Sequence, residues 1–125
     1  SLFVENQDKL FRKAQKIRRL LVDHYRALFA ECDCILASAA PTVAPLEDEA
    51  SDEALGKEHL VADNHMQLGN FSGYPSMTLP SGFVDGLPIG VNITCRPFEE
   101  QMMFDIAKAI EEETGLADHT VEVKA

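Results

Sequence analysis

The sequence predicts an α/β fold, or α+β for the chain in isolation: a small mixed sheet with a β-hairpin, packed by helices. Three observations predict this class. The chain opens with apolar residues at helical spacing, continues with two β-rich runs around an Asp85-Gly86 turn signal, and closes with a second helical stripe. Because 125 residues that are 46% hydrophobic suffice for one core, residues 1–125 are expected to form a single unit.

The first element is expected to be a long amphipathic helix between about residues 4 and 31. Its apolar side chains recur at steps of three and four, which places them on one helix face: Leu10, Ala14, Ile17, Leu21, Tyr25 and Leu28. The other face carries charged side chains: Arg12, Lys16, Arg19, Asp23 and Arg26. We interpret this charged face as solvated surface, with a phosphate-binding stripe as the alternative.

A short buried strand is expected over residues 32–38, because a run of apolar and small residues ends there before Pro41. Residues 46–58 are crowded with acidic side chains, which is typical of a solvated loop. A weaker helical pattern over residues 57–67 then leads into a turn at residues 70–75.

The clearest strands are predicted at residues 76–83 and 88–95. Between them, Asp85-Gly86 provides the positive φ angles that a tight hairpin turn needs. Pro80 has no backbone N–H to donate, which predicts a bulge or an unpaired position there. A sheet of three strands has edges that further strands usually cover, so we expect this sheet to be part of a larger one.

The last helix is predicted to begin at Glu99 and Glu100, whose carboxylates suit the N-terminal end of a helix dipole. Its inward stripe is apolar and helically spaced: Met103, Ile106, Ala107 and Ile110. Gly115 suits the left-handed residue that commonly ends a helix.

Charge is unevenly spread along the chain, whose net charge is −10. Residues 1–31 hold seven of the 11 Lys and Arg and four of the 21 Asp and Glu, so this segment is positive by three. The remaining 94 residues are negative by thirteen. Such an acidic body repels phosphate backbones, so the chain is not expected to bind nucleic acid by itself.

Cysteines and histidines are too few and too scattered to predict a disulfide framework or a metal site. Cys32, Cys34 and Cys95 have no zinc-site spacing, and we expect reduced thiols. No stretch reaches the roughly 18 apolar residues of a membrane helix, and the first residues lack a signal-peptide pattern. A cytoplasmic protein without membrane contact is expected.

The order of residues from Asn70 to Phe83, followed by Val-Asp-Gly-Leu-Pro-Ile-Gly at residues 84–90, resembles the C-terminal part of the amidase signature family. Within that family it is most similar to the glutamine-hydrolysing subunits of glutamyl-tRNA(Gln)/aspartyl-tRNA(Asn) amidotransferases. The similarity extends from residues 12–18 through Ala-Pro-Thr at 40–42 to Pro-Phe-Glu-Glu at 97–100. It implies that residues 1–125 are the C-terminal part of an amidase signature domain.

The resemblance implies a parent reaction in which glutamine is hydrolysed and the ammonia converts Glu-tRNA(Gln) to Gln-tRNA(Gln). It implies no cofactor in this chain, because ATP, magnesium and tRNA would be held by a partner subunit. The B and C subunits of the amidotransferase and the donor glutamine are the implied partners. Two alternatives stay open: an amidase signature amidohydrolase acting on a small amide, and a noncatalytic binding module.

The family hydrolyses amides with a Ser-cisSer-Lys triad, in which the nucleophilic serine lies in a Gly- and Ser-rich segment. No such segment is present, and the serines stand apart: Ser38, Ser72, Ser76 and Ser81. We therefore expect no catalytic residue in this chain, no activity from it alone, and a triad encoded before Ser1.

The resemblance assigns substrate contact to Asp63, seven positions before Asn70, where the family places a carboxylate against the α-ammonium of glutamine. An ammonium held in a cleft needs such a partner to offset desolvation. An exposed carboxylate or a helix-dipole partner is the alternative. Asn70, Gly73 and Ser81 are expected to shape the same pocket, and for Asn70 and Gly73 the alternative is a purely structural role in the turn.

Overall fold

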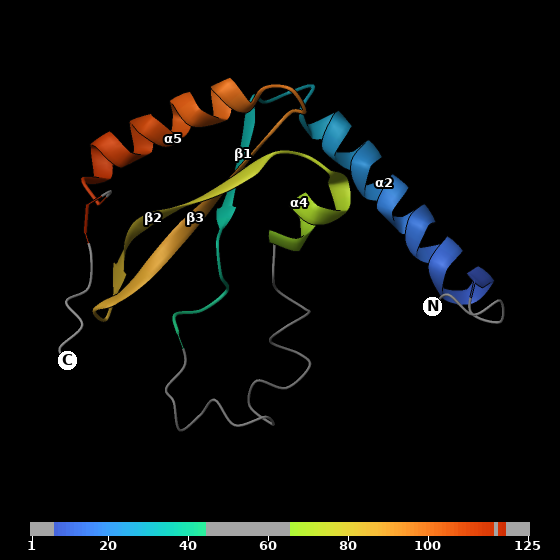
Figure 1. Cartoon of the computed structure of the whole chain (residues 1–125), viewed down its shortest axis with the longest axis horizontal. Coiled ribbons are helices and arrows are strands. Elements are labelled where there is room, and N and C mark those ends of the chain that lie inside the picture. The colour runs from blue at the N-terminus through green and yellow to red at the C-terminus, as the bar shows by residue number, and fades with distance from the viewer. Residues whose placement is uncertain (1–6, 45–65, 117, 120–125) are drawn as a thin grey trace.

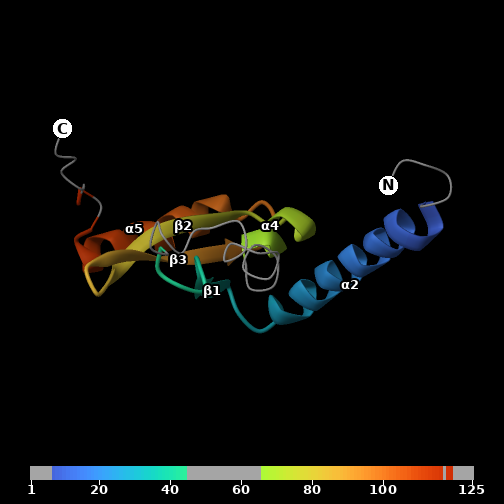
Figure 2. The ribbon, with the colours of Figure 1, turned by 90° about the horizontal axis from the view of Figure 1, so that it is seen from below.

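The computed structural model describes residues 7–44, 66–116 and 118–119, without the side chains of residues 66–68. Its elements follow one another as η1 (Gln7–Phe11), α2 (Arg12–Leu28), β1 (Cys34–Ser38), α4 (Met66–Ser72), β2 (Ser76–Val84), β3 (Leu87–Cys95) and α5 (Glu100–Thr114). Figure 1 shows α5 lying along the sheet while α2 leads away from it. The same contrast is visible from below in Figure 2.

The three strands are ordered β1-β3-β2, and both neighbouring pairs are antiparallel. The predicted fold class is confirmed, but the expectation of a mixed sheet is wrong for the described strands. A two-residue turn forces β2 and β3 to be antiparallel. The direction of β1 depends on a long connection, whose sequence carries no signal for it, and β1 pairs with β3 in the opposite sense.

The hairpin turn and the bulge both form where the sequence predicts them. Asp85 has φ +52° and Gly86 has φ +81°, which is the pair of left-handed residues expected in a type I′ turn. The register of β2 against β3 shifts between Pro80 and Gly82, so Ser81 is the extra residue of a bulge. The missing N–H of Pro80 is tolerated there.

The core lies between the sheet and α5. Side chains alternate along a strand, and the buried apolar members of β2 and β3 therefore project to one face, where they meet two residues of α5: Leu79, Ile93, Cys95, Met103 and Ala107. Ile106 and Ile110 pack against this cluster, which confirms the predicted stripe of α5. The helix ends as predicted at Gly115, which has φ +65° and donates its N–H to the Glu111 carbonyl at 2.9 Å.

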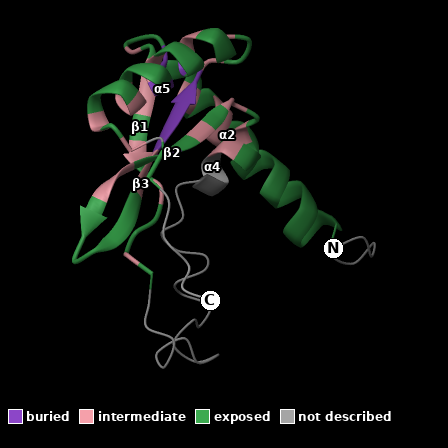
Figure 3. Ribbon diagram, turned by 60° about the vertical axis from the view of Figure 1, so that its left-hand side comes forward, coloured by how far each residue is buried: buried purple, intermediate pink, exposed green. Residues whose placement is uncertain are grey.

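The first helix is confirmed, but its apolar face is not buried by the described residues. Leu10, Ile17 and Leu28 are 57%, 51% and 54% exposed, and α2 contains no buried residue. Figure 3 shows the exposed colour over the N-terminal turns of α2, whereas the buried colour gathers at the sheet beneath α5. In the described part, the contacts of α2 with later elements begin at Arg18, which donates to the Phe71 carbonyl, and continue to its C-terminal end.

The turn predicted at residues 70–75 is shorter than expected, because α4 continues through Ser72. Asn70 is therefore helical rather than part of a turn. The chain reverses at Gly73, which has φ +76° and donates its N–H to the Gly69 carbonyl at 2.9 Å. The helix predicted over residues 57–67 lies almost wholly outside the described residues.

Candidate functional site

The described members of the predicted substrate-binding set lie in two places, Asn70 and Gly73 at the end of α4 and Ser81 in β2. Asp63 lies outside the described residues. Asn70 is exposed on α4, and Gly73 follows directly after that helix. Ser81 lies at the bulge of β2, five residues and about 16 Å of extended strand beyond Ser76. A binding role for these residues stays a prediction, and Ser81 would contact a different part of any pocket from Asn70.

Close packing fixes the position of α4 against the first residue of β2. A Cβ atom built on Gly69 would lie 2.8 Å from the hydroxyl oxygen of Ser76, so a larger residue would require that hydroxyl to rotate away. The Ser72 hydroxyl donates to the Gly69 carbonyl at 3.3 Å and accepts from the Tyr74 N–H at 3.3 Å. These contacts set the direction in which Asn70 is presented.

A row of hydrogen-bonded polar side chains crosses the sheet on the face opposite α5. The Asn92 side-chain amide donates to the Thr78 hydroxyl at 3.1 Å, and the Thr94 hydroxyl donates to the side-chain Oδ1 of Asn92 at 3.3 Å. Asn92 and Thr94 are only 5% and 6% exposed. The sequence reasoning missed this row, although polar residues two apart within an apolar strand could have indicated it. The row is uncharged, its polar atoms bond to one another, and it contains no activated nucleophile.

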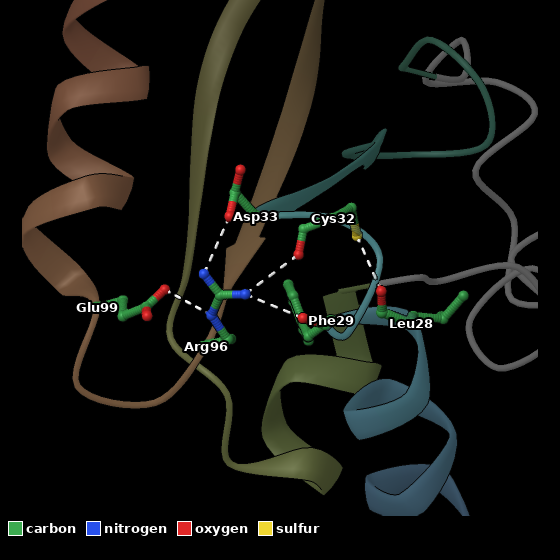
Figure 4. Close-up of polar contacts among 6 residues, drawn as sticks. All are labelled: Leu28, Phe29, Cys32, Asp33, Arg96 and Glu99. Carbon is green, nitrogen blue, oxygen red and sulfur yellow. Dashed lines mark hydrogen bonds and ion pairs between the residues drawn. The ribbon is translucent and has the colours of Figure 1, made fainter.

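Arg96 is the main polar junction of the described structure (Figure 4). Its guanidinium donates to the Glu99 carboxylate at 2.8 Å and to the Asp33 carboxylate at 3.0 Å. It also donates to the carbonyl oxygens of Phe29 at 2.9 Å and Cys32 at 3.4 Å. The hydrogen bonds to Glu99 and then Asp33 raise the pKa of the guanidinium, so it stays charged. Arg96 thereby joins the end of α2 to the connection between β3 and α5.

Three stacked aromatic rings attach α2 to the α4–β2 segment. The ring centroids of Phe29 and Tyr74 are 5.2 Å apart, and that of Tyr25 lies 5.4 Å from Tyr74. Burial raises the pKa of the Tyr25 hydroxyl. Arg18 adds a hydrogen bond to the Phe71 carbonyl. The stack and this bond determine how α4, which follows the segment containing Asp63, sits against α2.

The described residues contain no arrangement with the chemistry of a hydrolytic centre. Among them, no three His, Cys, Asp or Glu side chains are placed to hold a metal ion. The hydroxyls of Ser72 and Ser81 donate to backbone carbonyls, and within the described part no hydrogen bond joins a serine to a lysine or histidine. No helix in this part is long and apolar enough to cross a bilayer.

Comparison with known proteins identifies the protein family. The Amidase family model matches residues 2–104, and the chain belongs to this family. Its similarity to one group of amidases is extensive. It is 37% identical over 108 residues to the A subunit of Glutamyl-tRNA(Gln) amidotransferase from Fusobacterium nucleatum, covering 86% of this chain and 22% of the relative. The corresponding protein of Streptococcus mutans is 36% identical over 107 residues, with the same coverage. The predicted resemblance is confirmed.

Solved structures agree with the sequence comparison. The Glutamyl-tRNA(Gln) amidotransferase A subunit from Thermotoga maritima superposes with a TM-score of 0.83 at 30% identity, over 94% of this chain and 26% of that one. A bacterial aryl acylamidase of the amidase signature family gives a TM-score of 0.66 at 26% identity, over 78% of this chain and 21% of that one. The chain therefore spans about a fifth to a quarter of the length of these relatives.

Proposed function

We propose that this chain is the C-terminal part of a glutamine-hydrolysing A subunit of a tRNA-dependent amidotransferase. The observation that carries the proposal is the combined similarity to A subunits: 37% identity over 108 residues and a TM-score of 0.83 over 94% of the chain. The aryl acylamidase is a weaker match in both respects. In this proposal the whole subunit releases ammonia from glutamine, and the ammonia converts Glu-tRNA(Gln) to Gln-tRNA(Gln).

The proposed contribution of this chain is one wall of the glutamine pocket. The carboxylate of Asp63 would bind the α-ammonium of glutamine, while Asn70, Gly73 and Ser81 shape the surroundings. A Ser-cisSer-Lys triad would act from another part of the subunit. The packing of Gly69 on Ser76 and the aromatic stack support this role, because both hold α4 in place next to the segment that contains Asp63.

The proposed partners are the B and C subunits in the cytoplasm. The net charge of −10 supports a division of labour in which another subunit holds tRNA together with ATP and magnesium. No cofactor is assigned to this chain.

Asp63→Asn tests the proposal in the complete protein, assembled with its partners. Losing a charge-assisted hydrogen bond worth about 1.5–3 kcal/mol should raise the KM for glutamine about tenfold or more. Ammonium chloride bypasses glutamine hydrolysis, so amidation of Glu-tRNA(Gln) from ammonium should be unchanged. Asp52→Asn, in the acidic stretch of residues 46–58, is the matched control and should leave both activities intact. An unchanged KM in a folded Asp63→Asn protein would remove Asp63 from the pocket.

A second candidate is an amidohydrolase of small amides, supported by the similarity to aryl acylamidase and to a peptide amidase, which gives a TM-score of 0.62 at 26% identity. The complete protein should then hydrolyse an aryl amide or a peptide amide faster than glutamine. A third candidate, a noncatalytic binding module, predicts no hydrolysis of any of these amides by the complete protein.

A further inference from the structure

Two cysteines lie directly opposite each other in the sheet. Cys34 of β1 is the register partner of Cys95 in β3. The Ala39 N–H donates to the Gly90 carbonyl at 2.9 Å, which makes 39 and 90 a hydrogen-bonded pair. Such pairs alternate with non-hydrogen-bonded pairs along an antiparallel ladder, and Cys34 lies five steps from Ala39. Cys34 and Cys95 therefore form a non-hydrogen-bonded pair.

The direction of the Cys95 N–H supports this assignment. It donates to the Pro75 carbonyl at 3.1 Å, on the side of β2, and so points away from β1. Non-hydrogen-bonded pairs have Cα atoms about 4.5 Å apart and bring their side chains closest together. Disulfides span Cα separations of about 4.4–6.8 Å. The backbone is thus already at a separation that a disulfide can bridge.

Both thiols also face the same side of the sheet. Cys95 is 0% exposed and belongs to the core cluster under α5, and Cys34 packs against that cluster. Both cysteines are free, and Cys34 is the more accessible of the two. Burial raises the pKa of both thiols, and the charge of Cys34 raises the pKa of Cys95 further. The two thiols are therefore close enough for the charge of one to affect the pKa of the other.

We propose that Cys34 and Cys95 are a modification site, a dithiol that peroxide oxidises to a cross-strand disulfide between β1 and β3. Each thiol releases its proton before it reacts, and these two protons convert the two hydroxides that form into water. The Cys34 thiolate attacks one peroxide oxygen, the O–O bond breaks, and the products are a sulfenic acid and hydroxide, which becomes the first water. The Cys95 thiolate then attacks the Cys34 sulfur, forms the S–S bond and expels hydroxide, which leaves as a second water. Both sulfurs are oxidised by one electron each, and the peroxide is reduced.

The third cysteine has a different position. Cys32 precedes β1 and directs its sulfur to the Leu28 carbonyl at 3.3 Å. It has no partner in the strand register, which starts at Cys34. Cys32 is therefore the matched control for the pair.

The disulfide would fix β1, an edge strand, to the central strand. The adjoining residues Asp33 and Arg96 already join the same two segments through an ion pair of 3.0 Å. Oxidation would thus add a covalent bond next to the solvent-accessible ion pair of Asp33 and Arg96. This inference depends on the strand register and is independent of the proposed function.

The test is peroxide treatment of the purified protein, followed by N-ethylmaleimide blocking, digestion and mass spectrometry. A protease that cuts before Asp33 separates Cys32 from Cys34. We expect one linked peptide pair containing Cys34 and Cys95, lighter by about 2 Da than the two reduced peptides, that dithiothreitol separates again.

Variants make the outcome decisive. Cys32→Ala should form the Cys34–Cys95 link as completely as the wild type, and Cys34→Ala should lose it. The proposal is overturned if Cys34 joins Cys32 or a cysteine of another molecule. It is equally overturned if Cys34 is oxidised to sulfinic acid with no link, or if neither thiol reacts while the protein stays folded.

Discussion

The hairpin with α5 and the helix α2 are stabilised in different ways. The hairpin and α5 share a core whose central member, Ile93, is 0% exposed. Helix α2 buries none of its residues, and Ile17 on its apolar face is 51% exposed. Its attachment consists of the aromatic stack, the Arg18 bond and the Arg96 junction at its end. Within the described residues, one region carries its own core, and the other is held by contacts between Arg18 and its C-terminal end.

This difference supports the proposal that the chain belongs to a larger domain. An apolar helix face is ordinarily buried against another element. The described residues offer no such element to most of α2. A chain that covers about a quarter of the Thermotoga maritima structure is expected to leave such a face open.

The largest expected effect comes from the core of the hairpin. Ile93→Ala should lower the free energy of unfolding of the 125-residue chain by about 2–5 kcal/mol, because it removes packed atoms and leaves a cavity. Ile17→Ala removes the same atoms from an exposed helix face and should change the free energy of unfolding by less than about 0.5 kcal/mol. Urea unfolding checks both. Equal losses would refute the contrast between the two regions.

Arg96→Ala should have the next largest effect, because it leaves Asp33, Glu99 and two backbone carbonyls without their donor. We expect the urea midpoint to fall and amide exchange to accelerate in residues 25–33, with little change in β2. Arg96→Lys keeps the charge but not the planar donors, and should recover only part of the loss. Uniform acceleration across β2 and β3 would contradict a role limited to the junction.

Alkaline pH should weaken the core. Burial raises the pKa of the Cys34 and Cys95 thiols above the ordinary 9.0, so the folded chain retains their protons when the unfolded chain has released them. The stability that these neutral thiols contribute is complete below about pH 9 and is lost as the pH rises further. Unfolding of the reduced protein at increasing pH measures how steeply the free energy of unfolding falls with pH. The Cys95→Ala variant should show a shallower fall. A stability that rises above about pH 9 would contradict this assignment.

The turn of the hairpin should respond more modestly. Gly86→Ala places a Cβ atom at φ +81° and should cost about 1–2 kcal/mol. Asp85→Asn is the control, because asparagine tolerates the left-handed region at least as well as aspartate. In thermal unfolding, the melting temperature of Gly86→Ala should lie below that of Asp85→Asn. A neutral Gly86→Ala would mean that the turn relaxes to another type.

The smallest effect is expected for the ion pairs on α2. Arg19 and Asp23 are 3.2 Å apart with side chains 66% and 45% exposed. Arg19→Ala should therefore change the free energy of unfolding by at most about 0.5 kcal/mol. A loss comparable to that of Ile93→Ala would show that α2 depends on its charges rather than on its end contacts.

The sequence was sufficient for the elements that depend on local signals. Asp85-Gly86, Pro80 and Gly115 each impose a backbone requirement within a few residues, and the turn, the bulge and the helix end lie where they predict. The direction of β1 was not predictable in this way. Neither was the exposure of Ile17, because a periodic apolar face indicates that a helix has a partner without indicating whether this chain provides it.

Less of the candidate site than of the fold could be predicted from the sequence. The family resemblance pointed to Asp63 and Ser81, but distance along the strand separates Ser81 from α4. The row of Thr78, Asn92 and Thr94 depends on strand pairing across 14 residues, and Arg96 contacts Asp33 from 63 positions away. Contacts at such separation are set by the tertiary fold, and the only local sign of them is the spacing of Asn92 and Thr94, two residues apart in an apolar strand.

The most direct test of the account is covalent labelling of the complete protein with an electrophilic glutamine analogue, a diazo-ketone, followed by peptide mapping. If these residues form a wall of the pocket and the nucleophile lies elsewhere, the label should be on a serine outside residues 1–125, and free glutamine should protect it. Label on Ser38, Ser72, Ser76 or Ser81 would contradict the account.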